Sequence, residues 1–124
     1  MNANQQNIDK KEISKFNELA SRWWDTDGDF KPLHEINPLR LDYICRHSNL
    51  KDLKIVDIGC GGGILSEAMA KKGGIVTGID MAEKAIAVAK LHQIESKITV
   101  DYQLMTAEEL AEDEAGSFDI VTCL

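Results

Sequence analysis

The sequence has no run of the roughly 18 apolar residues that a membrane-spanning helix needs, so we expect no transmembrane segment. Positive charge is also scarce: 14 Lys and Arg stand against 21 Asp and Glu, which gives a formal net charge of −7. Without a basic surface to neutralise phosphates, we expect no binding to nucleic acid. The N-terminal stretch Met1–Lys11 is polar and lacks the apolar core of a signal peptide.

Cysteine is rare, and Cys45, Cys60 and Cys123 are an odd number at wide spacings. They fit neither a disulfide framework nor a zinc site, so we expect reduced thiols, no bound metal and a cytoplasmic location. The 124 residues are 44% hydrophobic and 28% charged, which is typical of one soluble globular domain at most.

Glycine, by contrast, is concentrated in one place. The apolar run Lys54–Ile58 predicts a buried strand, and four of the next five residues, Gly59–Gly63, are glycines. Helical spacing follows over Ile64–Lys72 and ends at Gly73-Gly74. A strand, a glycine turn and a helix in this order form a cradle in which the backbone can approach a ligand closely.

Strand and helix patterns alternate from Lys54 to Leu124, which predicts an α/β fold with a parallel sheet and helices on both faces. We expect strands at Lys54–Ile58, Ile75–Ile79, Ile98–Tyr102 and Phe118–Cys123, and helices at Ile64–Lys72, Met81–His92 and Thr106–Glu112. The last helix begins with a capping box formed by Thr106 and Glu109.

The residues before this unit predict a helical cap, and we divide the chain into an N-terminal segment 1–48 and the first part of a cofactor-binding domain, 49–124. A capping box at Asp9 and Glu12 should open a helix that runs to Trp24. An extended connection is expected over Phe30–His34. A second helix should start at Asn37-Pro38 and run to Ser48, with Arg40 in its first turn.

Two adjacent tryptophans, Trp23 and Trp24, stand at the end of the first helix. They cannot both face the same core from adjacent helical positions. Either both serve as packing anchors, or one packs under the domain while the other covers a ligand or a lipid.

The glycine turn has two enzymatic interpretations. A dinucleotide site needs G-x-G-x-x-G or A, but the third small position, counted from Gly59, is occupied by the branched Ile64. The pattern that fits is an acid, Asp57, two residues before a G-x-G-x-G turn made by Gly59, Gly61 and Gly63. This pattern resembles the first motif of the class I S-adenosylmethionine-dependent methyltransferases.

Charge favours the second interpretation. S-adenosylmethionine carries a sulfonium and an ammonium group, so Asp57 beside the turn would be useful, either by binding the amino group or by fixing the loop. Asp80 ends the second strand, 21 residues beyond Gly59, where a carboxylate can accept hydrogen bonds from ribose hydroxyls. Met81 would then lie against the adenine ring. The acidic stretch Thr106–Glu109 follows the third strand, near the adenine end.

The whole chain, from about Ile13 onward, resembles the ubiquinone-biosynthesis O-methyltransferase family. The matching segments are residues 21–25 (SRWWD), 30–34 (FKPLH), 36–40 (INPLR), 56–65 (VDIGCGGGIL), 76–81 (VTGIDM) and 118–123 (FDIVTC). The resemblance implies a class I, Rossmann-like methyltransferase fold with N-terminal helices, truncated after its fourth strand. It also implies that Arg40, Gly59, Asp80 and Leu124 contact S-adenosylmethionine.

The substrates implied by this resemblance are ring hydroxyls of a polyprenylated phenol and of demethylubiquinol. It further implies contact with other ubiquinone-biosynthesis proteins and peripheral contact with the inner membrane. The family carries seven strands, so we expect either a truncated chain or a dimer that covers the exposed strand Phe118–Cys123. No general base is identified. The alternative is a non-catalytic S-adenosylmethionine-binding or interaction module.

Overall fold

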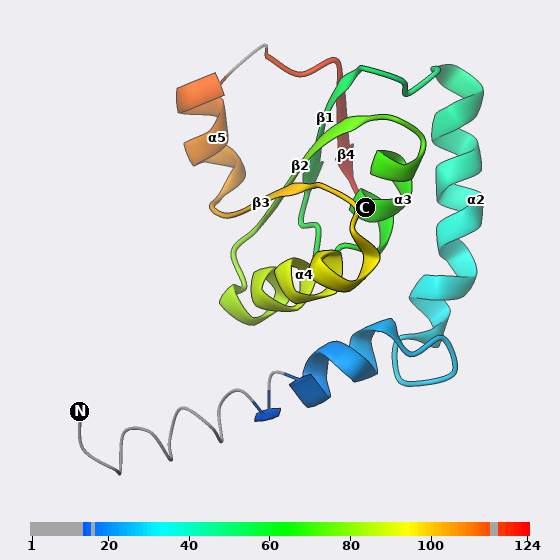
Figure 1. Cartoon of the computed structure of the whole chain (residues 1–124). Helices are drawn as coiled ribbons and strands as arrows, with labels where there is room; N and C mark the ends of the chain where they lie inside the picture. Colours follow the sequence, from blue (N-terminus) through cyan, green and yellow to red (C-terminus); the bar gives the residue numbers. More distant parts are fainter. Residues whose placement is uncertain (1–13, 16, 115–116) are drawn as a thin grey trace.

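A computed structural model describes residues 14–15, 17–114 and 117–124. Its centre is a parallel sheet in which the strands stand in the order β3-β2-β1-β4 (Figure 1). The strand bounds are β1 Lys54–Ile58, β2 Ile75–Asp80, β3 Asp101–Leu104 and β4 Ile120–Cys123. The predicted parallel α/β sheet is therefore confirmed.

Helices cover both faces of this sheet. Residues 17–24 are helical, and the later helices are α2 Lys31–His47, α3 Ile64–Lys71, α4 Glu83–Ser96 and α5 Ala107–Glu114. Figure 1 shows α5 on one side of the sheet and α2 and α3 on the other. No helix among the described residues is both long and apolar enough to cross a membrane.

The alternation of side chains along β1 builds two apolar clusters. Ile55 belongs to a larger cluster that includes Met69 of α3 and Ile86 of α4. Its neighbour Val56 points to the opposite face and packs in a smaller cluster with Leu110 of α5. Successive residues of a strand face opposite sides, so β1 is buried on both faces and fixes the layers on either side.

Several predicted elements are confirmed closely. β1 has the predicted bounds, α3 ends one residue early, and β2 extends one residue further, to Asp80. The Thr106 capping box is present: Glu109 N donates to Thr106 Oγ1 at 3.1 Å, and Thr106 N donates to Glu109 Oε1 at 3.4 Å. The first helix is confirmed where it is described, while its capping box at Asp9 and Glu12 lies outside the described residues.

The predictions of an extended Phe30–His34 and of a helix start at Asn37-Pro38 are wrong. One continuous helix, α2, begins at Lys31 and contains Pro38 in its interior. Pro32 lies in the first turn, where a missing N–H has no helical partner to lose. The Asn37 amide reaches across to α3, where Nδ2 donates to the carbonyl of Ile64 at 3.5 Å, and so does not cap a helix.

Three later elements begin two or three residues later than predicted. α4 starts at Glu83 and not at Met81, because Asp80 Oδ1 accepts a hydrogen bond from Ala82 N and holds the residues before the helix. β3 begins at Asp101 and not at Ile98, and Val100 N instead donates to Gln93 Oε1 at 3.0 Å. β4 begins at Ile120 and not at Phe118.

Removing the Thr106 cap should destabilise the fold modestly. Thr106→Ala leaves the N–H of Glu109 without its side-chain acceptor, so the free energy of unfolding should fall by about 1 kcal/mol. Urea unfolding followed by circular dichroism measures this change. Glu108→Gln alters an exposed neighbour in the same turn and serves as the control, with an expected change below about 0.5 kcal/mol. Equal stability of Thr106→Ala and the parent chain would contradict the cap.

Candidate functional site

The turn after β1 depends on left-handed glycines. Gly59, Gly61 and Gly63 have φ angles of 71°, 58° and 90°, a region that side chains with a Cβ rarely adopt. The amides of Gly59 and Cys60 both donate to the carbonyl of Ile79, at 2.8 and 2.9 Å, and tie the turn to β2. The predicted cradle therefore exists as a strand, a tight turn and the start of α3.

Asp57 is the buried link between three elements. The residue is only 3% exposed, and its carboxyl accepts hydrogen bonds from Ser66 Oγ of α3 at 2.6 Å and from Thr122 Oγ1 of β4 at 2.9 Å. Burial raises the pKa of Asp57, while the two hydroxyl donors partly oppose the rise. With a donor on each oxygen, this geometry favours loop fixing over direct binding of a cofactor's amino group.

Asp80 holds the turn from the other side. Its Oδ2 accepts the amide of Gly61 at 2.9 Å, and its Oδ1 accepts the amide of Ala82 at 2.8 Å. A carboxylate oxygen can accept more than one hydrogen bond, so both atoms keep the capacity to accept ligand hydroxyls. Asp80 therefore shapes the turn and can still accept hydrogen bonds from a ligand at the carboxyl end of β2.

A cavity of about 220 Å³ opens above the turn. It is lined by five of the residues predicted from the sequence to bind cofactor, namely Arg40, Asp57, Gly59, Gly61 and Leu124. The other three do not line it. Asp80 is hydrogen-bonded to the amide of Gly61 in the turn, and Met81 is 75% exposed. A Cβ on Gly63 would meet Tyr102 and Ala89, so that glycine serves helix packing.

Both tryptophans lie against the glycine turn. The Trp23 indole stacks on Phe30 with ring centroids 4.3 Å apart, and a Cβ built on Gly62 would overlap its indole nitrogen. Trp24 Nε1 donates to the carbonyl of Gly62 at 3.1 Å. Trp23 also lines the 220 Å³ cavity. Both rings are thus packing anchors, and Trp23 has in addition a position beside the candidate ligand site.

Trp24 is fixed by a chain of contacts that crosses the fold. Its ring stacks on His92 of α4, with centroids 3.4 Å apart and planes within 4°. His92 Nδ1 in turn pairs with the carboxylate of Glu67, a residue of α3 that is only 3% exposed. The N-terminal helical segment is therefore attached to α3, α4 and the glycine turn together.

Sequence reasoning missed several residues that shape the site. Ser66 and Thr122 were not assigned, although together they satisfy Asp57. Tyr102 packs beneath Gly63 and Gly78, where an added Cβ would clash with its ring or hydroxyl. Its hydroxyl is buried without a partner among the described residues, and burial raises its pKa. The glycine at 78, inside a strand, was the available signal of such close packing.

Cys60 sits within the turn and is 9% exposed. Burial, with lesser contributions from Asp57 and Asp80, raises the pKa of its thiol to about 12.

The described residues contain no group of three or more His, Cys, Asp or Glu side chains placed to hold a metal ion.

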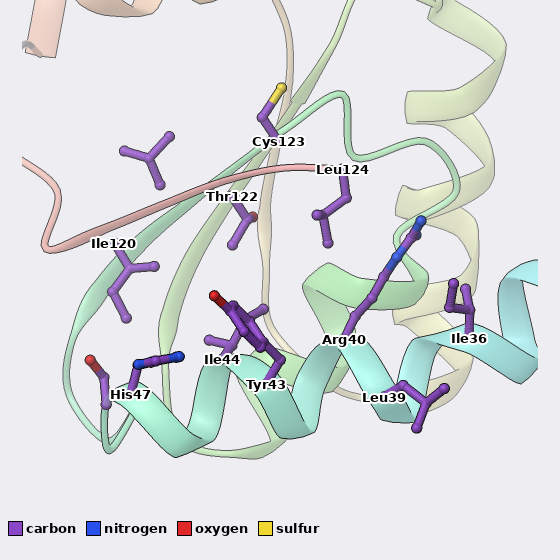
Figure 2. A pocket seen from close by; sticks show the side chains of 12 residues that line it. Ile36, Leu39, Arg40, Tyr43, Ile44, His47, Ile120, Thr122, Cys123 and Leu124 are labelled. Atoms are coloured by element: carbon purple, nitrogen blue, oxygen red, sulfur yellow. The ribbon is translucent and has the colours of Figure 1, made fainter.

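A second, larger cavity of about 540 Å³ lies between α2 and β4. Figure 2 shows Ile120 and Leu124 directed from the β4 segment toward α2, while Cys123 points away. The lining of this 540 Å³ cavity is mostly apolar and includes Leu39 and Tyr43, which are 70% and 65% exposed. Arg40 and Leu124 line both cavities, so the two are adjacent.

Known proteins match both the sequence and the fold. Residues 55–124 match the family model described as "Methyltransferase domain". The proteins named "Ubiquinone biosynthesis O-methyltransferase" from Pseudomonas aeruginosa PAO1 and Hahella chejuensis are 59% and 57% identical to the chain, over 95% and 96% of its length. The chain spans about half the length of these curated relatives, 51% and 50%.

Solved structures support the same fold. The magnesium protoporphyrin IX methyltransferase of Synechocystis, with bound SAH, superposes with a TM-score of 0.69 at 24% identity, over 89% of this chain and 52% of that one. The bifunctional kinase-methyltransferase WbdD gives a TM-score of 0.60 at 26% identity, over 82% of this chain and 23% of that one. At 24% identity, the similarity to the Synechocystis methyltransferase shows the fold alone.

The buried carboxyl of Asp57 should make stability depend on pH. Because its pKa is raised in the fold, its contribution to the free energy of unfolding is greatest below the ordinary value of 3.8 and is lost as pH rises through the raised pKa. Asp57→Asn cannot ionise, so the stability of the parent chain relative to this variant should fall as pH rises from the ordinary pKa of 3.8 through the raised pKa, by about 1.4 kcal/mol per unit of pKa shift.

Urea unfolding of both proteins across this range measures the difference. Ser66→Ala is the matched comparison, because it removes a hydrogen bond that lowers the pKa of Asp57 and should therefore extend the fall to higher pH. A difference between parent and Asp57→Asn that stays constant with pH would contradict the assigned burial effect.

Proposed function

The chain belongs to the methyltransferase-domain family, and from this premise we propose that it binds S-adenosylmethionine and forms the cofactor-binding part of an O-methyltransferase of ubiquinone biosynthesis. The observation that carries the proposal is the shared cavity. Arg40 from α2, the glycine turn and Leu124 after β4 come from distant parts of the sequence and line one space of about 220 Å³.

The chemistry of this cavity suits the proposed cofactor. Arg40 offers a guanidinium that can bind a carboxylate through paired hydrogen bonds. The carboxylates of Asp57 and Asp80 lie beside the turn and would disfavour a pyrophosphate, while a sulfonium or an ammonium group meets attraction there. A dinucleotide is therefore the poorer fit. Asp80 retains acceptor capacity for ribose hydroxyls, and Leu124 offers an apolar contact for the adenine.

The 540 Å³ cavity supports an apolar methyl acceptor. Its lining is mostly apolar, and it adjoins the cofactor cavity at Arg40 and Leu124. We assign the acceptor to the class of polyprenylated phenols and quinols, in accordance with the names of the relatives. A ring placed at the junction of the two cavities would bring its hydroxyl toward the methyl donor.

When bound, S-adenosylmethionine supplies an electrophilic methyl group. Held by Arg40 and the glycine turn, it would donate this methyl group to the oxygen of the acceptor's hydroxyl, and S-adenosylhomocysteine and a proton released to solvent would be the other products. The residues described here contribute positioning: Asp80 and Asp57 fix the turn, and residues of α2 line both cavities. Holding two reactants in such a geometry is itself a large source of rate acceleration.

Cofactor binding tests the first half of the proposal. The chain should bind S-adenosylhomocysteine in calorimetry, and Asp80→Ala should weaken binding by about 1–3 kcal/mol, since the amides of Gly61 and Ala82 lose their acceptor. Asp101→Ala is the matched control, because this exposed carboxylate stands at the start of the edge strand β3, paired in register with Thr77 and not with Asp80. Unchanged affinity of Asp80→Ala would refute its role, and absence of binding by the parent chain would sink the proposal.

Methyl transfer tests the second half. The chain, at saturating S-adenosylmethionine, is incubated with a demethylubiquinol analogue, and the methylated ring is measured by mass spectrometry. We expect transfer to a prenylated analogue and weaker transfer to an analogue without the prenyl tail, because only the former fills the apolar cavity. Cofactor binding with no transfer to either analogue would instead favour a non-catalytic cofactor-binding module.

A further inference from the structure

A closed series of contacts begins and ends at the glycine turn. Glu67 lies in the first turn of α3, where its amide donates to the carbonyl of Gly63 at 2.9 Å. Its carboxylate pairs with Nδ1 of His92 on α4. The His92 ring stacks on Trp24, whose indole N–H donates to the carbonyl of Gly62. The turn is therefore connected to itself through side chains from three helical segments.

Glu67 sets the orientation of His92. The residue is 3% exposed, and a carboxylate buried to this degree needs a hydrogen-bond donor, which is Nδ1–H of His92. The outer torsion of a histidine side chain has broad minima, but anchoring one ring nitrogen fixes the plane of the ring. The indole of Trp24 lies within 4° of that plane, with the ring centroids 3.4 Å apart. Glu67 thus orients His92, and His92 orients Trp24.

The oriented indole holds one peptide of the turn. Trp24 Nε1 donates to the carbonyl of Gly62 at 3.1 Å, and Asp80 Oδ2 accepts the amide of Gly61 at 2.9 Å. The pair Gly61-Gly62 is therefore held at both ends, and Gly61 lines the 220 Å³ cavity. Glycine loses more conformational freedom on ordering than any other residue, so a turn that is already held lowers the entropic cost of binding a ligand against it.

Stability alone does not require a polar pair at positions 67 and 92. Apolar side chains of similar volume often pack as well as a buried charged pair or better, because they avoid the cost of desolvation. An apolar pair has no directional contact, however. The hydrogen bond between His92 and Glu67 fixes the angle of the ring and, through it, the position of the Trp24 N–H. The polar pair is therefore suited to orienting the turn.

We propose that His92 is a positioning residue for cofactor binding, which acts with Glu67 through Trp24 on the Gly62 peptide. This inference rests on the proposed function, because the ligand is the proposed cofactor. Neither His92 nor Glu67 lines the 220 Å³ cavity, so both influence affinity without touching the ligand. The N-terminal helical segment, which carries Trp24, becomes part of the cofactor site by this route.

The test separates stability from affinity. His92→Leu leaves the buried carboxylate of Glu67 without its donor, whereas Glu67→Leu/His92→Leu removes both partners and should therefore withstand more urea than His92→Leu. Both variants take away the ring on which Trp24 stacks. Their affinity for S-adenosylhomocysteine, measured by calorimetry on the 124-residue chain, should fall by roughly 3- to 10-fold, the range of one lost hydrogen bond.

A variant of Trp24 tests the route of this effect. Trp24→Phe removes the N–H that holds Gly62 and should weaken binding about as much as Glu67→Leu/His92→Leu does. Adding Trp24→Phe to that double variant should weaken binding no further, because all three side chains act through one contact. Should the double variant fail to fold, Glu67→Gln/His92→Leu replaces the buried charge by a neutral amide and gives the same comparison.

Gln93→Leu is the matched control on the same helix. It removes the hydrogen bond that Val100 N donates at 3.0 Å, which is not part of the series from Glu67 to Gly62. Its affinity for S-adenosylhomocysteine should equal that of the parent chain, even where its stability is lower.

Each outcome has a defined meaning. A parent chain that does not bind S-adenosylhomocysteine overturns the proposed function and this inference with it. Where the parent chain binds, parent-like affinity in the folded double variant overturns the role of His92 and leaves the proposed function standing. An equal loss of affinity in Gln93→Leu shows a general effect of destabilisation and overturns the role. A further, additive loss when Trp24→Phe joins the double variant overturns it as well.

Discussion

The arrangement of this fold depends on one buried carboxylate. Asp57 sits in the central strand β1 and accepts a hydroxyl from α3 on one oxygen and a hydroxyl from β4 on the other. The three elements meet where the glycine turn begins, so the same contacts that stabilise the sheet also set the shape of the ligand cavity. Burying a charge is costly unless it is hydrogen-bonded, and here both oxygens have donors.

Two side chains from outside the glycine turn fix its conformation. Asp80 holds Gly61 from the end of β2, and Trp24 holds Gly62 from the N-terminal helical segment. The turn is thus bound by side chains that are 19 and 38 residues away in the sequence. Its conformation is a property of the whole fold, although its glycines permit it locally.

Local patterns were sufficient where a single sequence signal determined the structure. The apolar run before Gly59 gave β1 its exact bounds, and the Thr106 capping box placed the start of α5. Patterns failed where tertiary contacts decided. Pro38 suggested a helix start, but α2 continues through it, and Asn37 serves a contact with α3. Five predicted cofactor residues do share one cavity, yet the contact of Trp24 with His92 could be found only in three dimensions.

The raised pKa of Cys60 has a consequence for redox chemistry. The thiolate is the form that reacts with oxidants and alkylating reagents, and a thiol with a pKa of about 12 is almost entirely protonated near neutral pH. Cys60, in the middle of the glycine turn, should therefore react slowly with oxidants and alkylating reagents. Cys123, exposed on the edge strand β4, has no such protection from burial. Thiol-directed labels should consequently spare the glycine turn and react at Cys123, which lines the 540 Å³ cavity, with the half-buried Cys45 as the remaining free thiol.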